Sequence, residues 1–139
     1  MKPVIVAEIF DVPIEKVWNA ITDVETMKHW YFDNIDQFKP EVGSKSKFAV
    51  HSGDRSFTHL WEVTEVIPNK VLAYSWRYAE YPGDSELQFL LSEENGKTKL
   101  TVTATFIEEF PADIPEFKRE SCKAGWTYFI KERLKAFLE

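Results

Sequence analysis

The chain has 139 residues, a formal net charge of −6 and one cysteine, Cys122, so it suits a single domain (residues 1–139) and excludes an internal disulfide. The acidic balance argues against a nucleic-acid binder, and no apolar run approaches the roughly 20 residues of a membrane span. The N-terminus has no signal-peptide pattern, because an acidic residue interrupts its first apolar run, and we therefore expect a cytoplasmic protein.

The first 30 residues predict a strand followed by two short helices. Val4–Phe10 is β-branched and apolar, which is typical of a strand. Apolar residues then recur over Ile14–Ile21 at the spacing of one helical face. Thr22, with Glu25 three residues later, matches a capping box that begins a second helix, ending near Trp30.

The middle of the chain predicts five strands joined by consecutive hairpins. Apolar and polar residues alternate along each segment, as in strands with one buried face. Pro68-Asn69 and Asn95-Gly96 are turn signals between strands. The expected strands are 46–51, Phe57–Ile67, Val71–Arg77, Ser85–Ser92 and Leu100–Phe106.

The last part of the chain predicts an acidic loop and one long helix. Glu108–Glu116 holds acidic residues and two prolines, which favours a solvated loop. From about Pro115 to Glu139 the pattern is helical. At about 100° per residue, five apolar residues fall on one face of this helix. This apolar stripe consists of Cys122, Trp126, Ile130, Leu134 and Phe137. The apolar face of the hairpin sheet needs a cover, and only this helix is long enough to supply it.

Four segments in this order resemble the START-like (SRPBCC, helix-grip) superfamily over nearly the whole chain. They are "VPIEKVWNAITDVETMKHWYF", "EVGSKSKF", "WEVTEVIPNKVLAYSW" and "KAGWTYFIKERLKAFL". Within that superfamily the chain is most similar to the branch named for the activator of the heat-shock-protein-90 ATPase. The resemblance implies an α+β helix-grip fold like that of the birch-pollen allergen: a curved antiparallel six-stranded sheet around a long C-terminal helix, with two short helices after the first strand.

The resemblance also implies a hydrophobic cavity between the sheet and the long helix, and this chain departs from the family pattern near it. Trp61 stands where the pattern has glycine, and Ser46 stands where it has an inward aromatic residue. Ser44 replaces a second glycine, and Arg133 falls within the apolar helix stripe. An indole in place of a glycine would make the cavity smaller than in relatives.

Aromatic residues make up 15% of the chain, and such rings must fill a core, a cavity or an interface. We expect a ligand pocket lined by Trp30, Phe48, Trp61, Trp76, Phe89, Trp126 and Ile130. His59 and Arg133 are candidate polar anchors. The alternating pattern does not decide whether the face of Phe57–Ile67 that carries His59 is concave, where it could act on a ligand, or solvated. Arg133 could hold its guanidinium in water, receive an acidic ligand group, or pair with an acid such as Glu15 or Asp23.

The sequence indicates no metal site, cofactor or catalytic group. The three histidines lie in separate elements, and none has a second ligand at metal spacing. No glycine-rich phosphate loop is present. Cys122 has the position of a small buried hydrophobe.

Three functional classes remain open. The favoured one is a module that binds a hydrophobic or amphipathic small molecule, such as a lipid, in the cavity. The second is an enzyme of the cyclase or dehydratase kind, for which no acid–base pair can be placed. The third is a partner domain for a chaperone, for which the acidic loop Glu108–Glu116 is the only candidate surface. The oligomeric state does not follow from the sequence.

Overall fold

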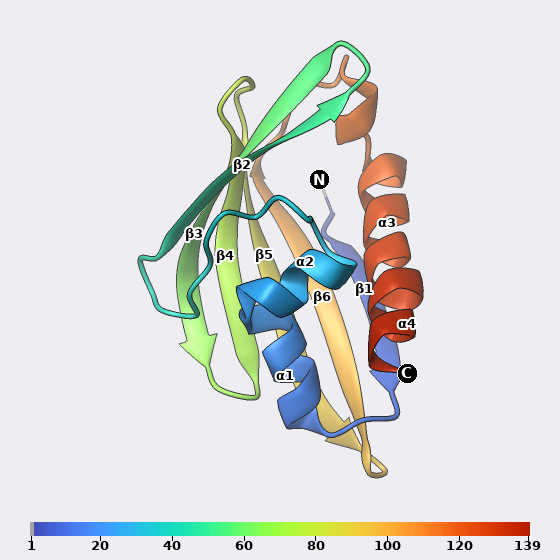
Figure 1. The fold of residues 1–139 in the computed structure, drawn as a ribbon. Helices are drawn as coiled ribbons and strands as arrows, with labels where there is room; N and C mark the ends of the chain where they lie inside the picture. Colours follow the sequence, from blue (N-terminus) through green and yellow to red (C-terminus); the bar gives the residue numbers. More distant parts are fainter. Residues whose placement is uncertain (1) are drawn as a thin grey trace.

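The computed structural model describes residues 2–139, in which a curved six-stranded sheet wraps around a long C-terminal helix (Figure 1). All strand pairs are antiparallel, in the order β1-β6-β5-β4-β3-β2. The predicted helix-grip fold is therefore confirmed. The elements are β1 (Val4–Phe10), α1 (Ile14–Thr22), α2 (Val24–Trp30), β2 (Lys45–Ser52), β3 (Arg55–Ile67), β4 (Val71–Tyr78), β5 (Asp84–Glu94), β6 (Lys97–Glu108), η1 (Pro115–Phe117), α3 (Arg119–Thr127), η2 (Tyr128–Leu134) and α4 (Lys135–Leu138).

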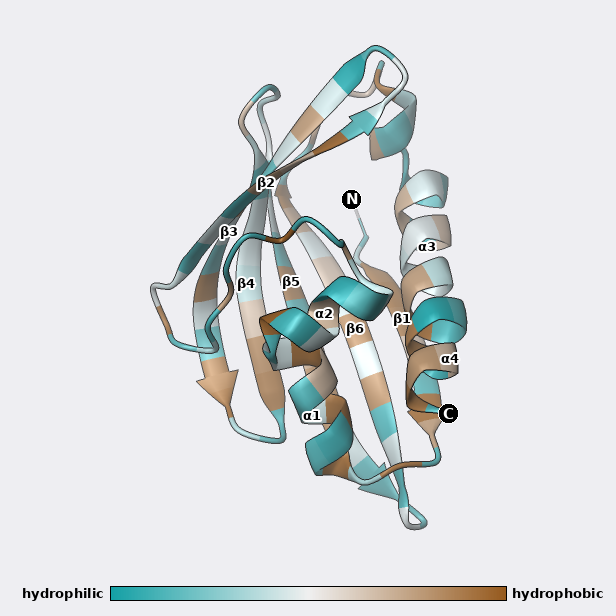
Figure 2. Ribbon diagram, in the orientation of Figure 1, coloured by the Kyte–Doolittle hydropathy of each residue, from teal (hydrophilic) through white to brown (hydrophobic). Residues whose placement is uncertain are grey.

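The alternating pattern of the strands sets which side chains enter the core. Along β6, Leu100, Val102 and Ala104 are buried, and the threonines between them are partly exposed. Figure 2 shows this alternation of hydropathy along the strands. The Asn95-Gly96 turn joins β5 to β6 as expected, with both residues at positive φ. The concave face is thus apolar, and the helices cover it.

The start of α2 differs from the capping box predicted at Thr22. Thr22 is the last residue of α1, and its hydroxyl donates to the Trp18 carbonyl at 2.7 Å. Asp23 is the N-cap: its Oδ2 accepts from the backbone N–H of Thr26 at 3.2 Å and from its hydroxyl at 2.7 Å. Threonine and aspartate are both good caps. Here the carboxylate of Asp23 satisfies the backbone N–H of Thr26. The helix itself lies where the sequence predicted it.

The C-terminal helix runs from Arg119 to Leu138 through α3, η2 and α4. Its buried residues Trp126, Ile130, Leu134 and Leu138 lie four positions apart. In a regular α-helix such a stripe would turn by about 40° at each step. The stretch η2 is a π-helix, whose wider turns offset that drift.

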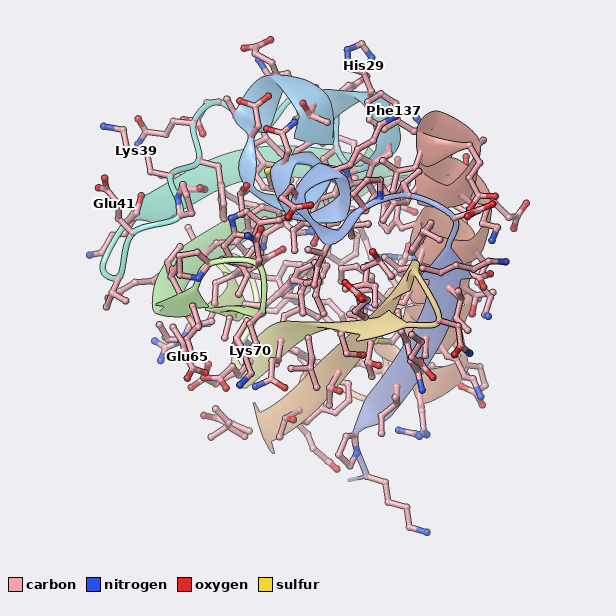
Figure 3. All side chains as sticks on the ribbon, turned by 90° about the horizontal axis from the view of Figure 1, so that it is seen from below. His29, Lys39, Glu41, Glu65, Lys70 and Phe137 are labelled. Carbon is pink, nitrogen blue, oxygen red and sulfur yellow. The ribbon has the colours of Figure 1, made fainter. Side chains whose placement is uncertain are left out.

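Two details of the predicted helix are wrong. It begins at Arg119, because Pro115–Phe117 forms a separate 3₁₀ turn. Phe137 is 43% exposed, and Leu138 takes the buried position that the sequence analysis assigned to Phe137. A strict period of 3.6 residues assigns the stripe to Phe137, and the π turns shift it by one residue. Phe137 instead stacks on His29 at 5.7 Å, outside the core (Figure 3).

Basic side chains of this helix fasten it along the free edge of β1. Lys131 Nζ donates to the Ala7 carbonyl at 2.8 Å, and Lys135 Nζ donates to the Ile9 carbonyl at 2.6 Å. Arg119 binds the backbone carbonyls just before the strand. These bonds satisfy edge groups that would otherwise be open to another strand. They also fix the helix so that its apolar side faces the sheet.

Candidate functional site

The structure settles which face of β3 is concave. Phe57, His59, Trp61 and Val63 are all at most 5% exposed. The Trp61 ring stacks on Tyr31, which follows α2, with ring centroids 5.4 Å apart. The face that carries His59 therefore points into the core, toward the helices.

A cavity of about 190 Å³ lies between the concave face of the sheet and α3. Its walls come from the segment after α2, from β3, β4, β5 and β6, from the loop around η1, and from α3 and η2, and most of the lining residues are apolar. The lining residues include His59, Trp76, Tyr78, Ala104, Gly125 and Trp126. Four consecutive strands and the C-terminal part of the chain thus contribute to one hollow.

Small residues on α3 and β6 leave this space open. Gly125 on α3 and Ala104 on β6 both line the cavity. A Cβ atom built on Gly125 meets no heavy atom within 4 Å. Glycine inside a helix costs about 1 kcal/mol relative to alanine, and its φ is not in the left-handed region here. The backbone thus gives no reason for a glycine at this position, and the open space beside it does.

His59 is the most buried titratable group on the cavity wall, with 4% of its surface exposed. Its Nδ1 lies 3.0 Å from the Phe57 carbonyl. A carbonyl only accepts, so Nδ1 carries the hydrogen and Nε2 keeps its lone pair. Burial lowers the pKa of His59 to about 4, and the hydrogen bond to Phe57 opposes this shift. The imidazole is therefore neutral at pH 7.

Two other polar groups on the wall also stay neutral. Burial raises the pKa of the Cys122 thiol to about 11, against the smaller effect of Arg119. Burial likewise raises the pKa of the Tyr78 hydroxyl above its ordinary value. A protonated thiol is a poor nucleophile, which agrees with the expectation that Cys122 is a small buried hydrophobe.

An ion pair ties the β2–β3 hairpin to η1 at the rim of the cavity. Arg55 Nε and one Nη donate to the two carboxylate oxygens of Glu116 at 2.9 and 3.1 Å. The Ser52 hydroxyl donates to the same carboxylate at 2.7 Å. These donors lower the pKa of Glu116 to about 2. Because Glu116 also lines the cavity, this clamp holds part of its wall in place.

The loop before η1 turns an aromatic ring inward. Phe110 lines the cavity and packs on Phe117 with centroids 5.2 Å apart. A Cβ on Gly83 would lie 2.3 Å from the nearest Phe110 carbon, and Gly83 has φ of 127°. Only glycine permits this approach. The acidic loop is thus not simply solvated, because it supplies part of the cavity wall.

Three of the residues predicted from the sequence lie on this wall: His59, Trp76 and Trp126. The rings of Trp76 and Trp126 contact each other with centroids 5.9 Å apart, one from β4 and one from α3. They bring the sheet and the helix together at the cavity. Contact of these residues with a ligand stays a prediction.

The other five predicted pocket residues lie in the core around the cavity rather than on its wall. Trp30 is fully buried and donates its Nε1 hydrogen to the Ala20 carbonyl at 2.7 Å. Phe48 stacks on His59 at 4.8 Å, and Phe89 lies edge-on to Trp126 at 5.9 Å. The five residues are Trp30, Phe48, Trp61, Phe89 and Ile130.

Trp61 points inward and fills space that a glycine would leave open. Its cross-strand partner is Ser46, whose hydroxyl donates to the Gln37 carbonyl at 2.6 Å. The large residue on β3 thus lies beside a small one on β2, where the family pattern has the reverse. Trp61 Nε1 is the only buried side-chain nitrogen or oxygen among residues 2–139 that has no hydrogen-bond partner.

Arg133 lies away from the cavity. Its guanidinium donates to the His29 carbonyl at 2.8 Å, at the end of α2, and to the Tyr128 hydroxyl at 3.4 Å. No ion pair with Glu15 or Asp23 occurs in the described part of the chain. A cation at the carboxyl end of a helix is favourable, so this contact accounts for a charge within the stripe. A ligand role for Arg133 stays a prediction.

Sequence reasoning missed several wall residues, among them Gly125, Ala104, Phe110 and Glu116. One signal was present: a glycine inside a long helix calls for a packing or functional reason. Phe110 and Glu116 gave no such signal, because their partners Gly83 and Arg55 are distant in sequence.

Residues 2–139 contain neither a metal-binding cluster nor a helix suited to crossing a membrane. No group of three or more His, Cys, Asp or Glu side chains within this range could hold a metal ion. Within the same range, no helix combines the length and apolar character that crossing a membrane requires.

Three solved structures resemble the chain closely in fold. A protein from Chromobacterium violaceum has a TM-score of 0.82 and 20% identity, and the match covers 99% of this chain and 96% of that one. A protein from Mesorhizobium loti has a TM-score of 0.78 and 28% identity over 99% and 96% of the two chains. The Aha1 dimer from Colwellia psychrerythraea has a TM-score of 0.74 and 24% identity over 100% and 97%. No curated protein matched the sequence.

A family model settles the classification. The model described as activator of Hsp90 ATPase homolog 1-like protein matches residues 11–139. This family lies within the SRPBCC superfamily, as the four sequence segments and the helix-grip fold led us to expect. The chain therefore belongs to the family of activator of Hsp90 ATPase homolog 1-like proteins.

Proposed function

We propose that this protein binds a small apolar molecule in the cavity between the sheet and α3. The observation that carries the proposal is the space beside Gly125 and Ala104, whose wall is rich in aromatic rings. Protein interiors normally pack without such voids. A helix that keeps a glycine beside one retains the space at a cost in stability.

The size of the cavity limits the ligand. An engineered cavity of about 150 Å³ in another protein holds benzene, and pockets for drug-sized ligands start at about 300 Å³. A cavity of about 190 Å³ therefore suits one ring with a short substituent. Long acyl chains or fused ring systems would need the wall to move.

Filling the cavity from the helix tests this proposal. Gly125→Leu would place a side chain in the open space and replace a poor helix former with a good one. Ala124→Leu, on the exposed neighbour of Gly125, is the matched control. We expect calorimetric titration with toluene to saturate for wild type and Ala124→Leu, and to show no binding for Gly125→Leu.

The melting temperature makes the result decisive. Gly125→Leu should melt at or above the wild-type temperature, so that lost binding is not lost folding. Binding of toluene by Gly125→Leu with wild-type affinity would overturn the proposed site. Lack of saturable binding by wild type to any single-ring hydrocarbon would overturn the function.

The pKa values of His59 and Cys122 on the wall support binding rather than catalysis. A general base works best when its pKa lies near the working pH, and burial holds that of His59 near 4. A thiol nucleophile needs a lowered pKa, and burial raises that of Cys122. A cyclase or dehydratase activity could therefore not use His59 as a general base or Cys122 as a nucleophile.

The family description favours a second candidate, a partner of the heat-shock-protein-90 chaperone. The acidic loop that the sequence offered for this role directs Phe110 and Glu116 toward the cavity. Measuring the ATPase rate of purified chaperone with added protein tests the candidate. Stimulation that persists with Gly125→Leu would assign it to a surface rather than to the cavity.

A further inference from the structure

The cavity wall holds a ring nitrogen that can accept a hydrogen bond and that no protein group uses. His59 Nδ1 is bound to the Phe57 carbonyl, so the only other polar atom of the ring is Nε2. No hydrogen bond to Nε2 occurs within residues 2–139. Nε2 is also not fully buried: within residues 2–139, the only fully buried side-chain nitrogen or oxygen that lacks a partner is Trp61 Nε1. Because His59 lines the cavity, its Nε2 is left to the cavity.

The direction of this acceptor is fixed by the surrounding rings. The imidazole stacks on Phe48 with an interplanar angle of 11° and a centroid distance of 4.8 Å. Trp76 and Tyr78 meet it edge-on at 5.1 and 5.0 Å. A ring held on several sides and tied at Nδ1 cannot turn to find another donor. Its lone pair is thus available in advance to a bound molecule.

The charges around the cavity select against anions. Its acidic wall residues are Glu86 and Glu116, and no lysine or arginine within residues 2–139 lines it. An anion would meet these carboxylates and would leave water without a partner, which is costly. Glu116 is already engaged by Arg55. A neutral molecule avoids the cost that an anion would meet.

We infer that the cavity prefers neutral single-ring molecules that carry a hydrogen-bond donor, such as a phenol, with His59 Nε2 as the acceptor. This inference rests on the proposed function and names the class of ligand for the same site. An apolar ring of equal size would leave Nε2 unpaired in a space from which water has been displaced. A phenol of that size would fill the same volume and also pair with Nε2.

Four ligands of similar size test the inference by calorimetric titration of the whole protein: p-cresol, toluene, anisole and benzoate. Toluene tests the volume, anisole adds only an acceptor, and benzoate adds a negative charge. We expect p-cresol to bind about 5- to 10-fold more tightly than toluene, as one hydrogen bond would allow. Anisole should not exceed toluene, and benzoate should bind most weakly.

His59→Phe removes the acceptor and keeps a ring, so it should bring p-cresol down to the affinity of toluene. Because that variant could fold poorly, ¹⁵N NMR of wild type gives a second readout. On titration with p-cresol the Nε2 resonance of His59 should shift as it accepts a hydrogen bond, and toluene should leave it in place.

The outcomes separate the two proposals. Equal affinities for toluene and p-cresol, or an Nε2 resonance that p-cresol does not shift, would overturn this inference and leave the proposed function intact. Failure of all four ligands to bind wild type would overturn both.

Discussion

The burial of a neutral His59 should make the stability of this protein depend on pH in a way that one substitution removes. Lowering the pH from 7 to 5 is the perturbation. In the unfolded chain this histidine takes up a proton near its ordinary pKa of 6.5, and in the folded protein burial lowers the pKa to about 4. A group whose folded pKa is lowered contributes stability that is complete above the unfolded pKa and is lost as the pH falls toward the folded one.

The size of the effect follows from these two values. Each pKa unit corresponds to about 1.36 kcal/mol. At pH 7 the unfolded histidine is about one quarter protonated, and at pH 5 it is almost fully protonated, while the folded one stays neutral. Linkage then lowers the free energy of unfolding by about 2 kcal/mol between pH 7 and pH 5. A carboxylate such as Glu116 contributes little here, because its unfolded pKa of 4.5 lies below this interval.

The assay is urea unfolding at pH 7, 6 and 5, for wild type and His59→Gln. The quantity compared is the change with pH within each protein, so a general loss of stability in the variant cancels. We expect wild type to lose about 2 kcal/mol and His59→Gln to lose less than half of that. His51→Gln, on the exposed end of β2, is the matched control and should behave like wild type. Equal losses in wild type and His59→Gln would refute the assignment of a buried, neutral His59.

Two further outcomes follow from the core. Trp61→Gly should lower the free energy of unfolding by about 3–5 kcal/mol, because it removes a large buried ring; a urea midpoint close to that of wild type would show that the ring contributes little. Cys122 should react slowly with a thiol reagent at pH 7, and its rate should rise about tenfold per pH unit toward its pKa of about 11; a rate that levels off near pH 8 would contradict a buried thiol.

Most of the fold was accessible from the sequence because its signals are local. The alternation from Leu100 to Phe106 and the Asn95-Gly96 turn depend on neighbours in the chain, and the structure confirms both. The errors arose where two local solutions were nearly equal. Thr22 and Asp23 are both good caps, and Asp23 is the one used. The buried residues of the last helix keep a spacing of four up to Leu138 because the helix contains a π segment.

The candidate site was less accessible because its walls depend on distant contacts. Both faces of β3 carry mixed residues, so the position of His59 could not be decided until the helices were placed. Phe110 lies within an acidic loop that the sequence predicted to be solvated. Its inward turn depends on Gly83, which lies 27 residues earlier in the chain. A cavity is an absence of side chains, and the sequence marks it only through the glycine at position 125.

We propose above that a small apolar molecule occupies the cavity beside Trp76 and Trp126. Fluorine NMR of protein labelled with 5-fluorotryptophan tests it directly, with each of the five resonances assigned by a Trp→Phe variant. On titration with toluene, the resonances of Trp76 and Trp126, which line the cavity, should shift and saturate together. Those of Trp18 and Trp30 should stay in place. Shifts at Trp18 or Trp30 without saturable shifts at Trp76 and Trp126 would contradict binding of the ligand in this cavity.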